Sequence, residues 1–167
     1  MDKLTLVIPA KYESESLPIV LTELKEYNLN TIVVLEKEDH ETIASIKGFD
    51  CNILYQVNKG YGDALIQGIN NVTTKYFCIF NADGSFDPKE LKDMYNCVEK
   101  AEADLVFGSR YMSDAGSEDD TIVTFVGNKI FTLIGKVFFF LPISDILYTY
   151  VLGNTKKTQL LNLQEKS

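Results

Sequence analysis

Five short apolar runs, separated by helical segments and polar loops, constrain the fold of this chain more than any other feature. The runs cover residues 4–8, 31–35, 53–57, 76–80 and 104–108. Between them lie segments with helical periodicity, and two of these have a proline, Pro18 or Pro88, at an early helical position. Strands that alternate with helices indicate a parallel sheet with right-handed crossovers. We therefore predict an α/β fold, with a Rossmann-like, mostly parallel sheet and helices on both faces.

Composition and charge exclude some classes of function. The 167 residues carry a formal net charge of −8. A nucleic-acid partner is not expected, because it would require a basic surface. An anionic substrate would have to be held by local lysines, backbone N–H groups or a metal ion, since the bulk charge repels it. Residues 1–3 lead directly into the first apolar run, so we expect no signal peptide and a cytoplasmic location.

A polar stretch from Asn81 to Gly84 follows the fourth run and precedes a predicted helix start near Asp87. Asn, Asp and Gly all favour turns, so a simple turn accounts for these residues. A carboxylate such as Asp83 at the carboxyl end of a strand also lies where open α/β sheets contact ligands. It suits a divalent cation that is shared with a diphosphate. Both interpretations remain open for this stretch alone.

The loops after the other runs favour a ligand site. In a parallel sheet they all meet at one edge. They carry acidic groups for a base and a ribose, a lysine for phosphate, and glycines that let backbone N–H groups approach at a helix start. These loop residues are Tyr12, Glu13, Glu36, Lys59, Gly60, Gly62, Asn81, Asp83 and Arg110. Neither G-x-x-x-x-G-K-[ST] nor G-x-G-x-x-G follows the first run, which disfavours a P-loop enzyme and a dinucleotide dehydrogenase.

Five motifs, in order along the chain, resemble those of glycosyltransferase family 2. They are VIPAKYE at 7–13 (family pattern V-I-P-x-Y-N-E), NKGYGDAL at 58–65 (N-x-G-x-x-x-A), NADGSFDP at 81–88 (D-A-D-G-x-x-x-P), VFGSRY at 106–111 (G-S-R-Y) and ISD at 143–145. Each motif is weak by itself, but their order and spacing together are specific. The subgroup that the chain resembles is the polyprenyl- or dolichyl-phosphate mannose and glucose synthases.

The resemblance implies a GT-A fold, a nucleotide-sugar donor and Mg²⁺ or Mn²⁺. It also implies that residues 1–112 form the nucleotide-sugar-binding core, and that 113–167 supply an acceptor-side loop and amphipathic helix of the same domain. The implied donor-site residues are Pro9, Ala10, Tyr12, Glu13, Glu36, Lys59, Gly60, Asn81, Ala82 and Asp83. Asp83, assisted by Asn81 and Ser85, would hold the metal. Arg110 would face the phosphates or the acceptor, and Asp145 would act as a base or orient the acceptor.

The chain departs from the family pattern at three places. Asn81 stands where the first Asp of the D-x-D motif is usual, so the site has one charge fewer. After the second run, where D-D-G-S is usual, only Glu36 preserves a carboxylate. The nucleobase that the donor site prefers therefore stays open. After Asp145 the usual P-x-x-G-[FY]-[RK] continuation is absent, and the chain ends at Ser167.

The function expected from these features is inverting transfer of a sugar from a UDP- or GDP-sugar to an acceptor, with a polyprenyl phosphate favoured over a glycan hydroxyl. Two alternatives remain. The protein could be a catalytically impaired remnant that binds nucleotide sugars, because of Asn81 and the short C-terminus. It could also be a sugar-phosphate nucleotidyltransferase, although the Gly- and Arg-rich loop expected after the first run is missing.

The segment 121–141 is amphipathic if helical. Its polar side carries Asn128, Lys129, Thr132, Gly135 and Lys136, and its apolar side carries Val123, Val126, Ile130, Phe131, Ile134, Val137, Phe138 and Leu141. We expect the apolar side to cover a core. The alternative is a peripheral helix on the inner face of a membrane, with its lysines at headgroup level. A helix that forms a homo-oligomer has the same periodicity, so self-association also stays open.

Overall fold

The computed structural model describes residues 1–101, 103–111 and 122–164. The chain forms two compact units: one contains residues 1–106 and 151–167, and the other contains residues 107–150. The elements are β1 (Leu4–Pro9), α1 (Ser16–Leu24), η1 (Lys25–Tyr27), β2 (Asn30–Leu35), α2 (His40–Ser45), β3 (Asn52–Tyr55), α3 (Tyr61–Asn70), β4 (Tyr76–Ile79), α4 (Glu90–Ala101), β5 (Leu105–Phe107), α5 (Ile122–Phe139), β6 (Val151–Asn154) and α6 (Thr155–Gln159).

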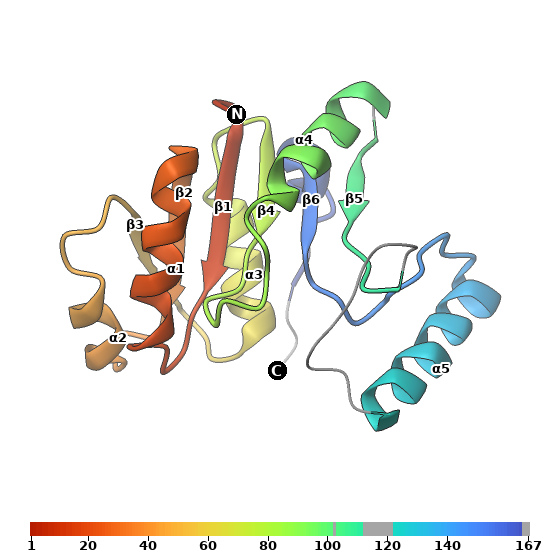
Figure 1. The fold of residues 1–167 in the computed structure, drawn as a ribbon, viewed down its shortest axis with the longest axis horizontal. Coiled ribbons are helices and arrows are strands. Elements are labelled where there is room, and N and C mark those ends of the chain that lie inside the picture. The colour runs from red at the N-terminus through yellow and green to blue at the C-terminus, as the bar shows by residue number, and fades with distance from the viewer. Residues whose placement is uncertain (102, 112–121, 165–167) are drawn as a thin grey trace. The chain divides into compact units, whose positions relative to one another are not determined.

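A six-stranded sheet in the order β3-β2-β1-β4-β6-β5 organises the first unit (Figure 1). β1 pairs in parallel with β2 and β4, and β2 pairs in parallel with β3. β6 pairs antiparallel with β4, with Phe77 opposite Gly153. The predicted α/β fold with a mostly parallel sheet is therefore confirmed. The carboxyl ends of β1 to β4 lie at one edge of this sheet, as the parallel pairing requires.

The two faces of the sheet are covered by different helices. Figure 1 shows α1 and α4 in front of the sheet and α3 behind it. A buried cluster on the α3 side contains Val7, Ile32, Val34, Ala64, Ile69, Val72, Phe77 and Ile79. Gly68 allows α3 to approach the strands closely, since a Cβ there would lie 2.3 Å from Cγ1 of Val7. On the other helices, the buried residues include Leu17 and Leu21 of α1 and Leu91 of α4.

The strand β6 was not predicted from the sequence. This four-residue strand lies between β4 and β5, and Leu152 is fully buried there. Gly153 makes room for its neighbours, because a Cβ would lie 2.4 Å from Cδ2 of Leu105. A glycine within a short strand weakens the sequence pattern by which strands are detected.

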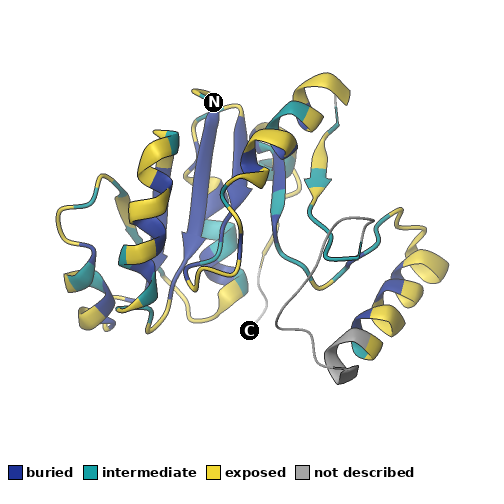
Figure 2. Cartoon of the chain, in the orientation of Figure 1, coloured by how far each residue is buried: buried dark blue, intermediate teal, exposed yellow. Residues whose placement is uncertain are grey.

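The expected orientation of α5 is also wrong. The buried positions are Asn128, Thr132 and Gly135, whereas the apolar side is exposed, with Phe131 at 54% and Phe138 at 71% (Figure 2). The polar side is buried because it contacts the segment around residues 145–146, as described below. Val123 of the predicted apolar side lies outside the residues whose side chains are described.

Candidate functional site

The loops at the carboxyl ends of β1 to β4 contain all of the predicted donor-site residues. Pro9 and Ala10, at the end of β1, are buried, and so are Glu36 after β2 and Ala82 after β4. Tyr12, Lys59, Gly60 and Asp83 are exposed, while Glu13 and Asn81 are partly exposed. The sheet therefore brings these loops to one edge, where Tyr12, Lys59 and Asp83 are accessible. Glu36 is a polar side chain buried at the same edge.

Asp39 holds the loop that follows β1. Its carboxylate accepts a hydrogen bond from the backbone N–H of Tyr12 at 2.7 Å and another from that of Thr42 at 3.2 Å. The Thr42 hydroxyl in turn accepts from the backbone N–H of Glu13 at 3.0 Å. Tyr12 has a left-handed φ of 59°, which is uncommon for a residue other than glycine. The β1 loop is therefore fixed by buried groups from the segment after β2.

Lys11 and Glu36 connect the ends of β1 and β2. The Lys11 ammonium donates to the Glu36 carboxylate at 2.8 Å, and Glu36 is 8% exposed. The hydrogen bond and the charge of Glu36 raise the pKa of Lys11. Beside this pair lies an open hollow of about 350 Å³, lined by residues 36–38 and 55–59. Its volume lies in the range of small-molecule sites.

The loop that precedes α3 is also held by side-chain hydrogen bonds. Buried Asp63 accepts from the side-chain amide of Asn58 at 3.0 Å and from its backbone N–H at 3.3 Å. Gln56 donates to the backbone carbonyl of Gly60 at 2.9 Å. Gly60 caps α3 with a φ of 114°, a conformation that favours glycine. The exposed Lys59 is thus presented by a loop whose backbone is fixed on both sides.

The Asn81–Ser85 turn forms after β4. The Asp83 carboxylate accepts from the backbone N–H of Ser85 at 2.9 Å, and the Asn81 amide nitrogen donates to the Ser85 hydroxyl at 3.0 Å. Among the described residues, no three His, Cys, Asp or Glu side chains gather as metal ligands. One carboxylate and one amide oxygen fit a hard cation that takes its remaining ligands from water and a diphosphate. The turn thus fits a shared metal and does not form a closed metal cage.

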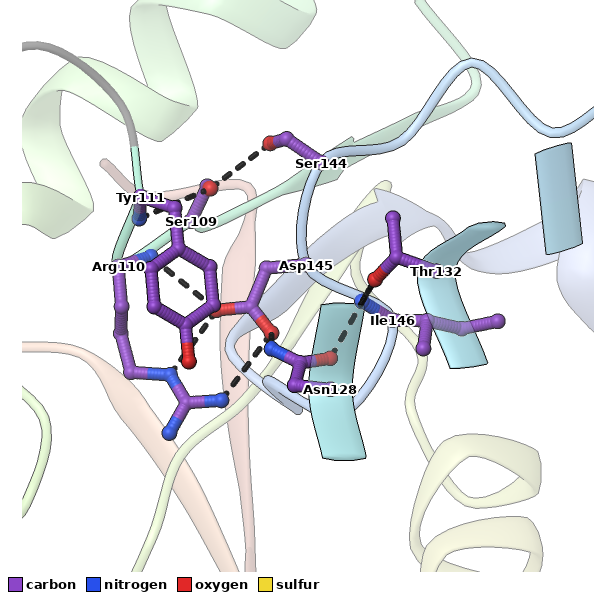
Figure 3. A network of polar contacts seen from close by, with 8 residues as sticks. All are labelled: Ser109, Arg110, Tyr111, Asn128, Thr132, Ser144, Asp145 and Ile146. Atoms are coloured by element: carbon purple, nitrogen blue, oxygen red, sulfur yellow. Dashed lines mark hydrogen bonds and ion pairs between the residues drawn. The ribbon is translucent and has the colours of Figure 1, made fainter. Parts of the chain in front are cut away.

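In the second unit, Arg110 and Asp145 form a bidentate ion pair (Figure 3). Nε of Arg110 donates to Oδ2 of Asp145 at 2.9 Å, and Nη2 donates to Oδ1 at 3.1 Å. The backbone N–H of Arg110 also donates to Oδ2 at 3.2 Å. The guanidinium lies 5.4 Å from the Tyr111 ring and 5.2 Å from the Tyr148 ring. The two residues predicted to be catalytic are therefore in direct contact.

Asp145 is buried and ionised. Burial raises its pKa, but hydrogen bonds from Arg110 and Asn128 outweigh this effect and hold the pKa below the usual range for aspartate. Its side chain is fully inaccessible, whereas that of Arg110 is 23% exposed. Of the two, Arg110 is the group that can reach a ligand.

Three residues that shape these sites were not predicted as site residues. Asp39 lies in a charged run that resembles a solvated loop, Asp63 lies within a recognised motif without an assigned role, and Asn128 lies on the polar side of a helix. Each is buried and hydrogen-bonded. The only sequence pattern that could have indicated Asp39 is an Asp three residues before Thr42, which fits a helix cap.

A profile of the family described as glycosyl transferase family 2 matches residues 5–159. The chain belongs to this family. An uncharacterized glycosyltransferase of Mycobacterium tuberculosis is 33% identical over 110 residues, which cover 65% of this chain and 49% of that protein. The low-salt glycan biosynthesis hexosyltransferase of Haloferax volcanii is 33% identical over 89 residues, or 52% of this chain and 21% of that protein.

Solved structures confirm the GT-A fold of this chain. Glucosyl-3-phosphoglycerate synthase from M. tuberculosis, in complex with Mn²⁺, UDP and glucosyl-3-phosphoglycerate, matches with a TM-score of 0.74 at 12% identity. That match covers 93% of this chain and 57% of the other. Mannosyl-3-phosphoglycerate synthase from Rubrobacter xylanophilus matches with a TM-score of 0.73 at 14% identity, over 93% and 54% of the two chains. The present chain thus spans about half the length of these proteins.

Within the part of the chain that the structure describes, no helix combines the length and the apolar character needed to cross a membrane.

Proposed function

We propose that this glycosyltransferase moves a sugar, with inversion, from a UDP- or GDP-sugar to a polyprenyl phosphate. The main support for a donor site is that the loops after β1, β2, β3 and β4 meet at one edge of the sheet. These loops contain Lys11, Glu36, Lys59 and Asp83. Residues 1–112 would hold the donor, and the part of 113–167 that belongs to the second unit would serve the acceptor together with Arg110. Glucosyl-3-phosphoglycerate synthase, which has a similar fold, was solved with UDP-glucose and Mn²⁺, and this supports a nucleotide-sugar donor.

Each loop has a proposed role in donor binding. Pro9, Ala10, Tyr12, Glu13 and Glu36 line the nucleoside site. Lys59 and the backbone at Gly60 approach the ribose or the diphosphate, while Asp83 and Asn81, next to Ala82, would hold Mg²⁺ or Mn²⁺ together with the diphosphate. When bound, the ion neutralises negative charge that develops on the leaving diphosphate. The protein positions the donor so that its anomeric carbon is open to attack from the opposite side.

The state of Asp145 supports a phosphate acceptor. A sugar hydroxyl would need a general base, but the Asp145 carboxylate is buried and already bound to Arg110 and Asn128. A phosphate monoester has a second pKa near 6 and is largely ionised at neutral pH, so it can attack without a base. Arg110 would contact this anion, and Asp145 would orient Arg110.

The exposed side of α5 supports a lipid-linked acceptor. Val126, Ile130, Leu133, Val137 and Phe138 are each about half exposed or more. A contiguous apolar surface of this kind usually contacts a partner or a membrane. We propose that it lies on the inner face of a membrane, because Lys129 and Lys136 flank the apolar side and suit anionic headgroups.

Vesicle flotation tests the membrane contact. The protein should float with vesicles of phosphatidylglycerol and phosphatidylcholine, and Phe138→Asp should abolish this. A matched change on an exposed helical position of the first unit, Ile19→Asp, should not. Concentration-dependent dimerisation in place of flotation would assign the apolar side to a homo-oligomer and overturn the membrane proposal.

Calorimetric titration tests the donor site. UDP-glucose, UDP-galactose and GDP-mannose are titrated with Mn²⁺ and then with EDTA, on the wild type, Asp83→Ala and the exposed control Asp50→Ala. We expect metal-dependent binding of one donor, which is lost in Asp83→Ala and kept in Asp50→Ala. Binding without transfer to farnesyl phosphate or to sugar acceptors would support the remnant that Asn81 suggests. Release of pyrophosphate from UTP or GTP with a sugar phosphate would instead identify a nucleotidyltransferase.

A further inference from the structure

A chain of hydrogen bonds links α5 to the Arg110–Asp145 pair (Figure 3). The backbone N–H of Ile146 donates to the Thr132 hydroxyl at 3.3 Å, and this hydroxyl donates to Oδ1 of Asn128 at 3.3 Å. The Nδ2 group of Asn128 then donates to Oδ1 of Asp145. Thr132 and Asn128, in the middle of this chain, each accept one hydrogen bond and donate one. The order therefore fixes which end of the Asn128 amide faces Asp145.

The Asp145 carboxylate has no acceptor capacity left in this arrangement. Oδ2 accepts from the backbone N–H and Nε of Arg110, and Oδ1 accepts from Nη2 of Arg110 and from Asn128. Four hydrogen bonds use the approximately four lone-pair positions that a carboxylate offers. Asp145 is therefore occupied as an anchor and is not available to take a proton from a substrate.

Burial makes the contribution of Asn128 significant. Asn128 and Asp145 are each 1% exposed, and Thr132 is 5% exposed. Water cannot replace a lost donor at such a site without rearrangement, and a buried carboxylate that loses a partner is costly. Removal of the Asn128 amide would thus leave Oδ1 of Asp145 with one partner, Nη2 of Arg110.

We propose that Asn128 is a positioning residue, which clamps the Asp145 carboxylate in the orientation that aims the Arg110 guanidinium at an anionic group of the acceptor. Thr132 supports the clamp by holding the Asn128 amide in the correct orientation. The adjacent segments reinforce it, because the Ser144 hydroxyl donates to Ser109 at 2.7 Å. The orientation of Arg110 thus depends on Asn128 of α5, which lies 18 positions further along the chain.

The identity of the anion rests on the proposed function, but the clamp itself does not. The test therefore includes a measurement that needs no activity. In the full, isotopically labelled chain, NMR follows the carboxyl carbon of Asp145 through a pH titration and the hydrogen exchange of the Arg110 Nε–H. The variants are Asn128→Leu, Thr132→Val and the conservative control Thr132→Ser.

In Asn128→Leu, we expect the Asp145 titration to move upward by about half to one pH unit, because one hydrogen bond to the ionised form is lost. Exchange of the Arg110 Nε–H should quicken severalfold. Thr132→Val should shift both in the same direction by less, and Thr132→Ser should leave both unchanged. If Asn128→Leu fails to fold, the Thr132 pair still decides. Unchanged titration and exchange in Thr132→Val, or in a folded Asn128→Leu, would overturn the clamp.

Kinetics with UDP-glucose and farnesyl phosphate then test the acceptor role. Asn128→Leu should raise the KM for farnesyl phosphate about tenfold, as expected for one misplaced charge-assisted contact, with the donor affinity unchanged. A wild type that binds no donor would refute the proposed function, while the NMR result would still decide the clamp. An altered donor affinity with an unchanged acceptor KM would overturn the assignment of Arg110 to the acceptor.

Discussion

The backbone N–H of Tyr12 donates to the carboxylate of Asp39 at 2.7 Å, so a buried side chain after β2 fixes the left-handed backbone after β1. Asp39 also caps α2 through the backbone N–H of Thr42. One carboxylate therefore determines the conformation of two loops at the proposed donor edge. Its exposure is only 4%, although it lies in a strongly charged part of the sequence.

Asp39→Ala should lower the free energy of unfolding by about 1–2 kcal/mol, because it removes a helix cap and a buried acceptor. It should also weaken binding of the sugar nucleotide, since Tyr12 loses the contact that holds its backbone. Urea unfolding and calorimetry measure the two effects. Asp50→Ala, at an exposed position before β3, should change neither. Equal stability and affinity in the two variants would show that Asp39 does not hold the loop.

The stability contribution of Asp39 should depend on pH. Burial raises its pKa, but the hydrogen bonds from Tyr12 and Thr42 outweigh burial and leave the pKa lowered. A lowered native pKa stabilises the fold above the unfolded pKa, which is about 4, and this stabilisation is lost as the pH falls through the native value. The stability difference between wild type and Asp39→Asn should thus be largest at neutral pH and should shrink below about pH 4. A difference that widens on acidification would contradict this sign.

Lys11 and Glu36 should behave as a coupled pair. Removal of Lys11 leaves a buried carboxylate without its cation, so Lys11→Met should lose more stability than the exposed position of the ammonium suggests. Glu36→Gln in the same chain should recover part of the loss. A double-mutant cycle monitored by urea unfolding measures the coupling. Strict additivity would mean that the two side chains act independently.

Two helical glycines should respond in opposite directions to alanine. Gly68→Ala should cost about 1–3 kcal/mol, because the new Cβ meets Val7 between α3 and the sheet. At Gly127 of α5 a Cβ meets nothing within 4 Å, and Gly127→Ala should stabilise its helix by about 0.5–1 kcal/mol. Thermal unfolding followed by circular dichroism compares them. A neutral Gly68→Ala would show that α3 can move away from the strands.

The sequence predicted the elements whose determinants are local. The apolar runs of β1, β2 and β4 are continuous because these strands are covered on both faces, and Gly60 marks the start of α3. The burial of Asp39 and Asn128 could not be predicted in this way. Asp39 accepts from Tyr12, and Asn128 donates to Asp145, so both partners lie outside the local sequence. A helical pattern also cannot distinguish a buried polar side from a solvated one.

The same difference between local and tertiary determinants applies to the donor and acceptor sites. The loops of the donor site follow strands, so parallel topology alone predicted that they would gather at one edge. The contacts that hold these loops, such as those of Asp63 with Asn58, depend on side-chain geometry that motif spacing does not encode. The orientation of α5 depends on tertiary contacts with Asp145 and Ile146, which helical periodicity does not encode.

The pairing of Phe77 in β4 with Gly153 in β6 has a consequence for biosynthesis. During translation, residues 1–106 emerge from the ribosome long before the strand that completes their sheet. Until residues 151–154 have been synthesised, β4 presents an open edge of unpaired backbone groups, which favours association with other chains. Pairing of β6 with β4 therefore removes a surface through which incomplete chains would associate.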